Sequence, residues 1–169
     1  MKRISMILAA LLCGMPMVAK VQPGSPISDN MVLQQNTKAR LFGKAKAGAK
    51  VTATPSWNSK TYETKAGKDG KWIVEVETPK GGYTPYSIVL SDGEPLTLDN
   101  VLVGEVWLAS GQSNMQMPLR GYWGCPIKGG YEEVAHSGNW KDKIRFMTLP
   151  LVQSYTPMDT VAARWTVPC

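Results

Sequence analysis

Histidine is nearly absent from this chain of 169 residues, in which His136 is the only one, and cysteine is scarce, with three residues. So few imidazole and thiol groups exclude the Cys/His spacings that hold structural zinc, and the sequence predicts neither a metal nor another cofactor. A reaction that needs a histidine base can draw only on His136 within this sequence.

The chain also lacks a dense basic cluster. Its 19 Lys and Arg residues outnumber 13 Asp and Glu residues, giving a formal net charge of +6. Apart from Lys2 and Arg3, the basic residues are scattered between Lys20 and Arg164 and are not interleaved with aromatic side chains. Because nucleic-acid binding usually requires a concentrated basic face, the sequence predicts no nucleic-acid partner.

No apolar run is long enough for a comfortable membrane span. The longest, Ile4 to Ala19, is interrupted by Gly14 and Pro16, whereas a spanning helix needs about 20 apolar residues. Lys2 and Arg3 precede this run, which is the pattern of a secretory signal peptide. We therefore predict a signal peptide over residues 1–19 and export to the periplasm or the cell exterior.

Two cysteines, Cys125 and Cys169, remain once residues 1–19 are removed. An exported protein can form disulfides, but spacing alone does not establish that these two residues pair. The sequence leaves this question open, together with the oligomeric state.

Residues 20–100 have the pattern of an antiparallel β-sandwich. Short segments rich in β-branched and aromatic residues alternate with Gly, Pro, Asn and Asp, a spacing typical of small sandwiches. Alternation is clearest over residues 71–77, where Trp72, Val74 and Val76 share one face. The predicted strands cover residues 38–42, 50–54, 60–64, 71–77 and 86–90.

The pattern changes over residues 101–169. The apolar run 101–109 lacks alternation, which predicts a strand buried on both faces of a parallel sheet, with Trp107 in the core. Residues 131–135 are predicted to be helical, and residues 143–149 to form the next strand. Two strands are fewer than a doubly wound sheet needs, so we expect only part of such a domain.

Two strings of this sequence together resemble one family of hydrolases. They are residues 27–35, ISDNMVLQQ, and residues 103–115, VGEVWLASGQSNM. The first is similar to the opening of the amino-terminal β domain of the sialate O-acetylesterase family, and the second to its first block as an SGNH (GDSL-like) hydrolase. Two strings in the expected order are more specific than a lone Gly-x-Ser. The resemblance covers residues 21–169.

The resemblance implies an α+β fold, with a β-sandwich over residues 20–100 and the beginning of an α/β/α SGNH-hydrolase domain over residues 101–169. Only the amino-terminal portion of the family is matched, so we expect the segment to be truncated and inactive alone. The implied activity is hydrolysis of O-acetyl esters on sialic acid or related glycans, through a serine acyl-enzyme.

Ser113 is the predicted nucleophile, at a turn after the apolar run. Its backbone N–H would help to stabilise the oxyanion, and Gly111 would permit the sharp turn. Gln112 and Asn114 are expected to order this turn or to contact the substrate. The alternative is a polar turn in which Ser113 merely caps a helix.

A base for Ser113 is missing from the pattern. The family's histidine belongs to a late Asp-x-x-His block, whereas His136 follows Glu133 and lies far too early. We therefore predict that His136 is a loop or helix-end residue. Ala109 replaces a cysteine that is common in the family, and Gln116 stands where glutamate is frequent, which removes any acidic contribution there.

Trp123, in a Gly-rich loop close to Ser113, is the best candidate for stacking on a sugar, although loop aromatics also pack as plugs. The expected partner is thus an acetylated glycan. Two other functions remain open: a non-catalytic glycan-binding module built on the β-sandwich, and an acetylesterase acting on plant polysaccharide.

Overall fold

The computed structural model describes residues 20–158 and 160–168. The predicted signal peptide and Cys169 lie outside these residues, so neither the leader nor a Cys125–Cys169 disulfide is tested. Cys125 is exposed and forms no disulfide with another described residue. The strands and helices are β1 (Gln22–Pro23), β2 (Val32–Gln34), β3 (Lys38–Lys44), β4 (Lys50–Pro55), β5 (Tyr62–Lys65), β6 (Lys71–Glu77), β7 (Gly82–Ser91), β8 (Pro95–Gly104), α1 (Ser113–Gln116), α2 (Gly130–His136), the 3-10 helix η1 (Ser137–Trp140), β9 (Phe146–Met147) and β10 (Trp165–Thr166).

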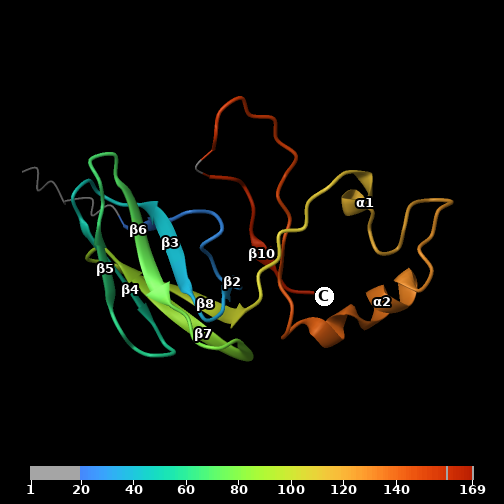
Figure 1. Cartoon of the computed structure of the whole chain (residues 1–169), viewed down its shortest axis with the longest axis horizontal. Coiled ribbons are helices and arrows are strands. Elements are labelled where there is room, and N and C mark those ends of the chain that lie inside the picture. Colours follow the sequence, from blue (N-terminus) through green and yellow to red (C-terminus); the bar gives the residue numbers. More distant parts are fainter. Residues whose placement is uncertain (1–19, 159, 169) are drawn as a thin grey trace, which may run out of the picture.

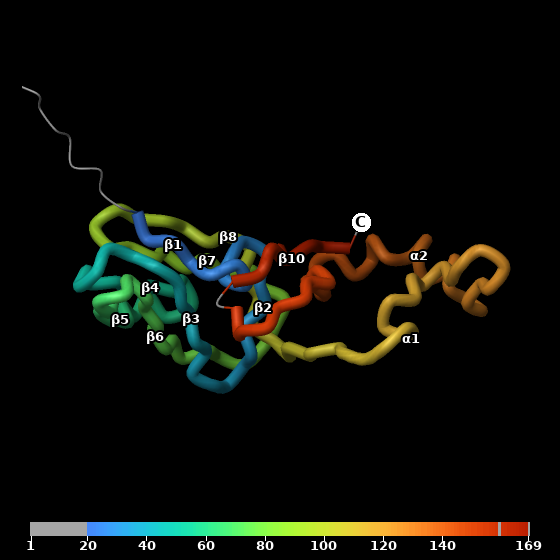
Figure 2. Tube along the Cα trace, turned by 90° about the horizontal axis from the view of Figure 1, so that it is seen from above, coloured from blue at the N-terminus to red at the C-terminus, as the bar shows by residue number. Residues whose placement is uncertain are grey.

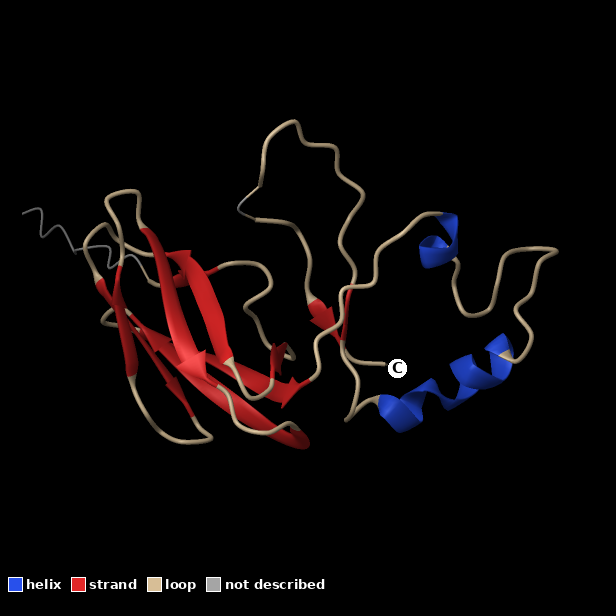
Figure 3. Cartoon of the chain, in the orientation of Figure 1, coloured by secondary structure: helices blue, strands red, loops and turns tan. Residues whose placement is uncertain are grey.

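Two facing sheets build the first part of the molecule, as Figures 1 and 3 show. One has the strand order β1-β3-β6 and the other β2-β8-β7-β4-β5. All five predicted strands are confirmed within a few residues. The prediction of a purely antiparallel sandwich is wrong at one place, because β2 pairs with β8 in parallel. These two strands are far apart in sequence, so no tight turn forces them to be antiparallel.

The core lies between these sheets. Trp72, Val74 and Val76 of β6 are buried, while Ile73, the neighbour of Trp72, is 58% exposed, so the predicted alternation is confirmed. Leu41 of β3 and Val51 of β4 are also fully buried. Burial of such side chains from both sheets is the main favourable term that holds the sandwich together.

The prediction of a buried strand over residues 101–109 is wrong beyond Gly104. Strand β8 ends there, and residues 105–112 form no helix or strand. Trp107, expected in the core, is 87% exposed, and Leu108 is 86% exposed. A strand buried on both faces needs paired neighbours and covering helices, and within residues 20–158 and 160–168 no strand pairs with residues 105–109.

Residues after Gly104 extend from one end of the sandwich, as Figures 1 and 2 agree. The helix expected at residues 131–135 is confirmed as α2. The strand expected at residues 143–149 is only the two residues of β9, which pair antiparallel with β10 instead of joining a parallel sheet. The α/β/α architecture therefore stays a prediction, and so does the division at residue 100, which β8 crosses.

No helix in the described part of the chain is long and apolar enough to cross a membrane.

Replacement of Trp72 by alanine is expected to destabilise the sandwich by about 3–5 kcal/mol, because it removes a large buried side chain and leaves a cavity. Ile73→Ala, on the opposite face of the same strand, should cost less than about 1 kcal/mol. Urea unfolding of both variants measures the difference. Equal losses of stability would contradict the assignment of these two faces.

Candidate functional site

The segment that leads to Ser113 is fixed to the sandwich by the other matched string. Strand β2 pairs in parallel with the end of β8, with Val32 opposite Leu102 and Gln34 opposite Gly104. The backbone N–H of Gln35 donates to the carbonyl oxygen of Gly104 at 2.8 Å. The end of the first matched string thus lies beside the beginning of the second.

Two asparagines set the start of this pairing. Asn30 and Asn100 have φ angles of 63° and 55°, in the left-handed region that asparagine tolerates better than most residues. The Asn100 side-chain amide donates to Oδ1 of Asn30 at 2.6 Å. The N–H of Asp99 donates to Oδ1 of Asp29 at 2.8 Å. These side chains align the two chain segments just before their strands meet.

Two glutamines hold the chain where β8 ends. The Glu105 carboxylate accepts hydrogen bonds from Nε2 of Gln34, at 3.0 Å, and from Nε2 of Gln35. Oε1 of Gln34 in turn accepts from the N–H of Val106 at 2.9 Å. The bonds from Gln35 and Gln34 lower the pKa of Glu105, since they stabilise the ionised carboxylate. Residues 105–112, the serine segment, lead from β8 to Ser113. These hydrogen bonds fix the first residues of that segment.

Sequence reasoning assigned no role to these amides. Gln34 and Gln35 belong to the first matched string, and Glu105 belongs to the second. Two polar residues at the end of a strand do not indicate which distant residue they bind. Only the parallel pairing of β2 with β8 brings them together.

Arg145 makes a second connection to β8 and was also missed. Its guanidinium is buried and donates to Oδ1 of Asn100 at 3.3 Å and to the carbonyl oxygens of Ile144 and Lys141. A buried arginine with several acceptors fixes the backbone that supplies them. The segment before β9 is thereby held against the start of the β2–β8 pairing.

Ser113 is the first residue of α1 and is exposed. The N–H of Met115 donates to the carbonyl oxygen of Gln112 at 2.9 Å, which closes the turn around the serine. Gln112 gives no side-chain cap, and Asn114 is exposed. Gly111 is not among the described glycines with positive φ, and a Cβ there would lie 2.8 Å from Cγ of Met115, so its role in the turn stays a prediction.

The structure does not bring His136 to Ser113. His136 is the exposed last residue of α2, as the sequence predicted, and no hydrogen bond joins it to Ser113. Figure 1 shows α1 and α2 as separate elements. Among the described residues there is also no group of His, Cys, Asp and Glu side chains that could hold a metal ion. The described part of the site is therefore a serine without a base.

A cavity of about 740 Å³ lies where the sandwich meets the serine segment. Its volume is in the range of about 300–1,000 Å³ that is usual for small-molecule sites. Glu105, Trp107 and Ala109 line it from the serine segment, and Arg145 lines it from the later part of the chain. The polypeptide that leads to Ser113 thus forms one wall of a cavity large enough for a sugar.

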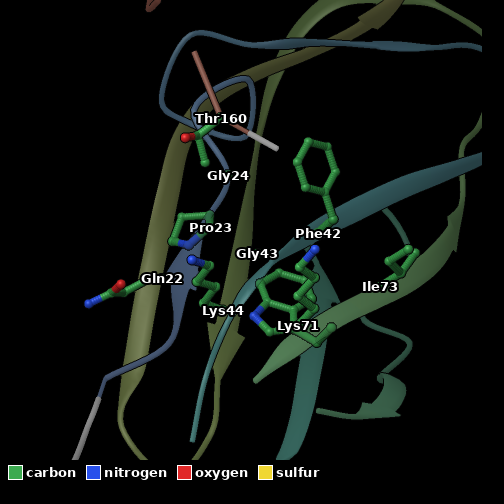
Figure 4. Close-up of a pocket in the computed structure, with 10 residues that line it drawn as sticks. Gln22, Pro23, Gly24, Phe42, Gly43, Lys44, Lys71, Ile73 and Thr160 are labelled. Atoms are coloured by element: carbon green, nitrogen blue, oxygen red, sulfur yellow. The ribbon is translucent and has the colours of Figure 1, made fainter. Parts of the chain in front are cut away.

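A smaller cavity, of about 350 Å³, lies elsewhere on the sandwich, at β1, β3 and β6 (Figure 4). Phe42 and Ile73 provide apolar walls, and Lys44 and Lys71 bring ammonium groups. It contains none of the side chains predicted to act in the reaction.

Trp123 is fully exposed, at the tip of a tight turn between Tyr122 and Cys125. The side chain is thus uncovered among residues 20–158 and 160–168, as a role in sugar stacking requires, and that role stays a prediction.

Comparison with known proteins gives a consistent result. No protein-family model matches the chain. Sialate O-acetylesterase of Rattus norvegicus is 29% identical over 157 residues, which covers 85% of this chain. The Mus musculus protein of the same name is 29% identical over 145 residues, 80% of this chain, and the Homo sapiens protein 28% over 158 residues, 85% of this chain.

Among solved structures, a carbohydrate acetylesterase from Xanthomonas citri matches with a TM-score of 0.76 and 26% identity, over 88% of this chain and 32% of that one. The chain spans less than a third of each of these relatives: 28% of the rat, 26% of the mouse and 29% of the human protein.

Proposed function

We infer from the sialate O-acetylesterase family, to which this chain belongs, that Ser113 is the nucleophile of an exported carbohydrate esterase that acts on O-acetylated glycans. One observation carries the proposal. The match to a carbohydrate acetylesterase extends over 88% of the chain. In this chain the parallel β2–β8 pairing fixes the point at which the serine segment begins. The proposal covers the reaction class and leaves the choice of sugar to experiment.

In the proposed reaction the Ser113 hydroxyl oxygen attacks the acetyl carbonyl carbon while its proton passes to a base. The carbonyl electron pair moves onto oxygen and returns as the bond to the sugar oxygen breaks, while the base gives its proton to that oxygen, which leaves acetyl-Ser113 and a free sugar hydroxyl. Water then releases acetate. Because Ser113 begins α1, its N–H has no acceptor within that helix and can donate to the oxyanion.

The base is proposed to come from polypeptide other than the described residues. Within residues 20–158 and 160–168, the single histidine makes no hydrogen bond to Ser113. General-base catalysis requires a donor–acceptor distance of about 2.6–3.2 Å, directly or through one water. This requirement agrees with a chain that spans less than a third of its relatives.

Ser113→Ala, made in the protein as its native cell produces it, is expected to reduce hydrolysis of O-acetylated sialyllactose or acetylated xylotetraose by at least about 10³-fold, because no acyl-enzyme can form. Acetate release and labelling by a fluorophosphonate probe measure the loss. Ser110→Ala, an exposed serine three residues earlier, is the matched control and should keep normal activity and labelling. Full activity in Ser113→Ala would rule out the proposed nucleophile.

Residues 20–169 alone are expected to show no Ser113-dependent hydrolysis of 4-nitrophenyl acetate, because the serine lacks a base there. The purified segment and its Ser113→Ala variant should give the same background rate. Turnover that disappears in the variant would mean that this segment holds a complete site.

The pKa of Glu105 gives a separate test of the hydrogen bonds that fix the beginning of the serine segment. Gln35→Ala is expected to raise this pKa towards its ordinary value, because the first of the two stabilising hydrogen bonds is lost. In the wild type the lowered pKa stabilises the fold above the unfolded-state pKa, and this contribution is lost as the pH falls through the folded-state pKa. A carbon-13 NMR titration of the carboxylate measures the change, and an identical titration in the variant would contradict the contact.

A further inference from the structure

Residues 119–130, between α1 and α2, form a loop whose two ends touch. A Cβ on the buried Gly130 would lie 2.0 Å from the carbonyl oxygen of Leu119, so only glycine permits this approach. The N–H of Gly121 donates to the carbonyl oxygen of Pro118 at 2.8 Å, and the N–H of Gly130 donates to the carbonyl oxygen of Ile127 at 3.0 Å. Loops of this size that close on themselves are compact Ω-loops, which are often functional.

The tip of this loop is a tight turn that holds Trp123 outward. Tyr122 and Cys125 exchange two backbone hydrogen bonds, of 3.2 and 2.9 Å. Gly124 has a φ of 77°, which non-glycine residues rarely adopt. Gly121 also has a positive φ, and a Cβ there would lie 2.3 Å from the carbonyl oxygen of Cys125. The backbone on both sides of Trp123 is therefore constrained, although its side chain is fully exposed among the described residues.

One hydrogen bond ties this turn to the helix that begins with Ser113. The Tyr122 hydroxyl donates to the carbonyl oxygen of Gln116 at 3.2 Å, and Gln116 is the last residue of α1. Tyr122 is adjacent to Trp123. The indole is thus connected to the serine helix through a single side chain and a closed turn, which makes Tyr122 a positioning residue for Trp123.

An indole held in this way suits a sugar ring. Its flat face is apolar, and it carries one N–H donor at its edge, whereas a pyranose has an apolar C–H face and a rim of hydroxyl acceptors. A fully exposed tryptophan on a constrained loop leaves this surface in water until a ligand covers it. The proposed substrate, an acetylated glycan, supplies a ligand of that chemistry.

We propose that residues 119–130 are a sugar-binding platform, on which Trp123 stacks against the glycan residue next to the one whose acetyl ester Ser113 cleaves. The proposal rests on the proposed function of Ser113 and adds a subsite to it. Stacking on Trp123 increases the affinity for oligosaccharides and does not affect a small aryl ester, which has no neighbouring sugar.

The test compares two substrates in the protein as its native cell produces it. Trp123→Ala is expected to raise KM for acetylated xylotetraose or O-acetylated sialyllactose by about 3- to 10-fold, the value of one aromatic contact, with kcat nearly unchanged. Hydrolysis of 4-nitrophenyl acetate should stay normal. Trp123→Phe should recover part of the affinity. Tyr122→Phe should raise KM in the same direction, because it removes only the hydroxyl that bonds to Gln116.

Tyr155→Ala is the matched control, since Tyr155 is as exposed as Trp123 but lies outside the loop. It should change neither KM. An unchanged oligosaccharide KM in Trp123→Ala would overturn the platform, and so would an equal loss with both substrates, which would indicate that Trp123 packs on polypeptide instead.

Calorimetric titration of the Ser113→Ala protein with the same oligosaccharides separates the two proposals. Binding that weakens on adding Trp123→Ala supports the platform even if Ser113 proves not to be the nucleophile. Binding that is unaffected by Trp123→Ala overturns the platform and leaves the role of Ser113 intact.

Discussion

The parallel pairing of β2 with the end of β8 is the contact on which the candidate site depends. It places Gln34, the last residue of β2, and Gln35, the next residue, beside the point where the chain leaves the sandwich, and their amides donate to the Glu105 carboxylate. Since β8 also pairs with β7 inside the sandwich, the chain that leads to Ser113 begins from a rigid sheet. Without this pairing the serine segment would have no defined origin, because residues 105–112 belong to no helix or strand.

The β2–β8 pairing lies at the boundary between two parts of the chain that are stabilised by different interactions. Up to Gly104, buried apolar residues from both sheets form one core cluster, and their burial maintains the fold. Beyond it, order comes from local closure: the turn at Ser113, the loop of residues 119–130, and the buried Arg145 that binds back to Asn100. Local closure fixes the shape of each turn with little buried apolar area, so we expect these turns to be less stable than the strands of the sandwich.

Burial could be predicted from the sequence for the first part of the chain and not for the second. Alternation over residues 71–77 identifies a strand with one buried face, because a facing sheet is supplied by the same chain. The run at residues 105–109 is just as apolar and was predicted to be buried, yet it is exposed, since periodicity reports which residues prefer burial and not whether a partner is present. The pairing of Gln34 and Gln35 with Glu105 could not be predicted because their separation of about 70 residues is bridged only by sheet topology.

Three tryptophans show what determines whether a large aromatic side chain is buried or exposed in this molecule. Trp72 is buried because its strand has a facing sheet, and Trp107 is exposed because its segment is unpaired. Trp123 is exposed for a different reason: its loop is complete in itself, with closed ends, a hydrogen-bonded tip and a tie to α1. Residues 105–109 have no strand partner among the described residues, whereas the turn that carries Trp123 is closed by backbone hydrogen bonds of its own. That difference in local closure, more than exposure itself, is the physical argument for separating Trp123 from Trp107.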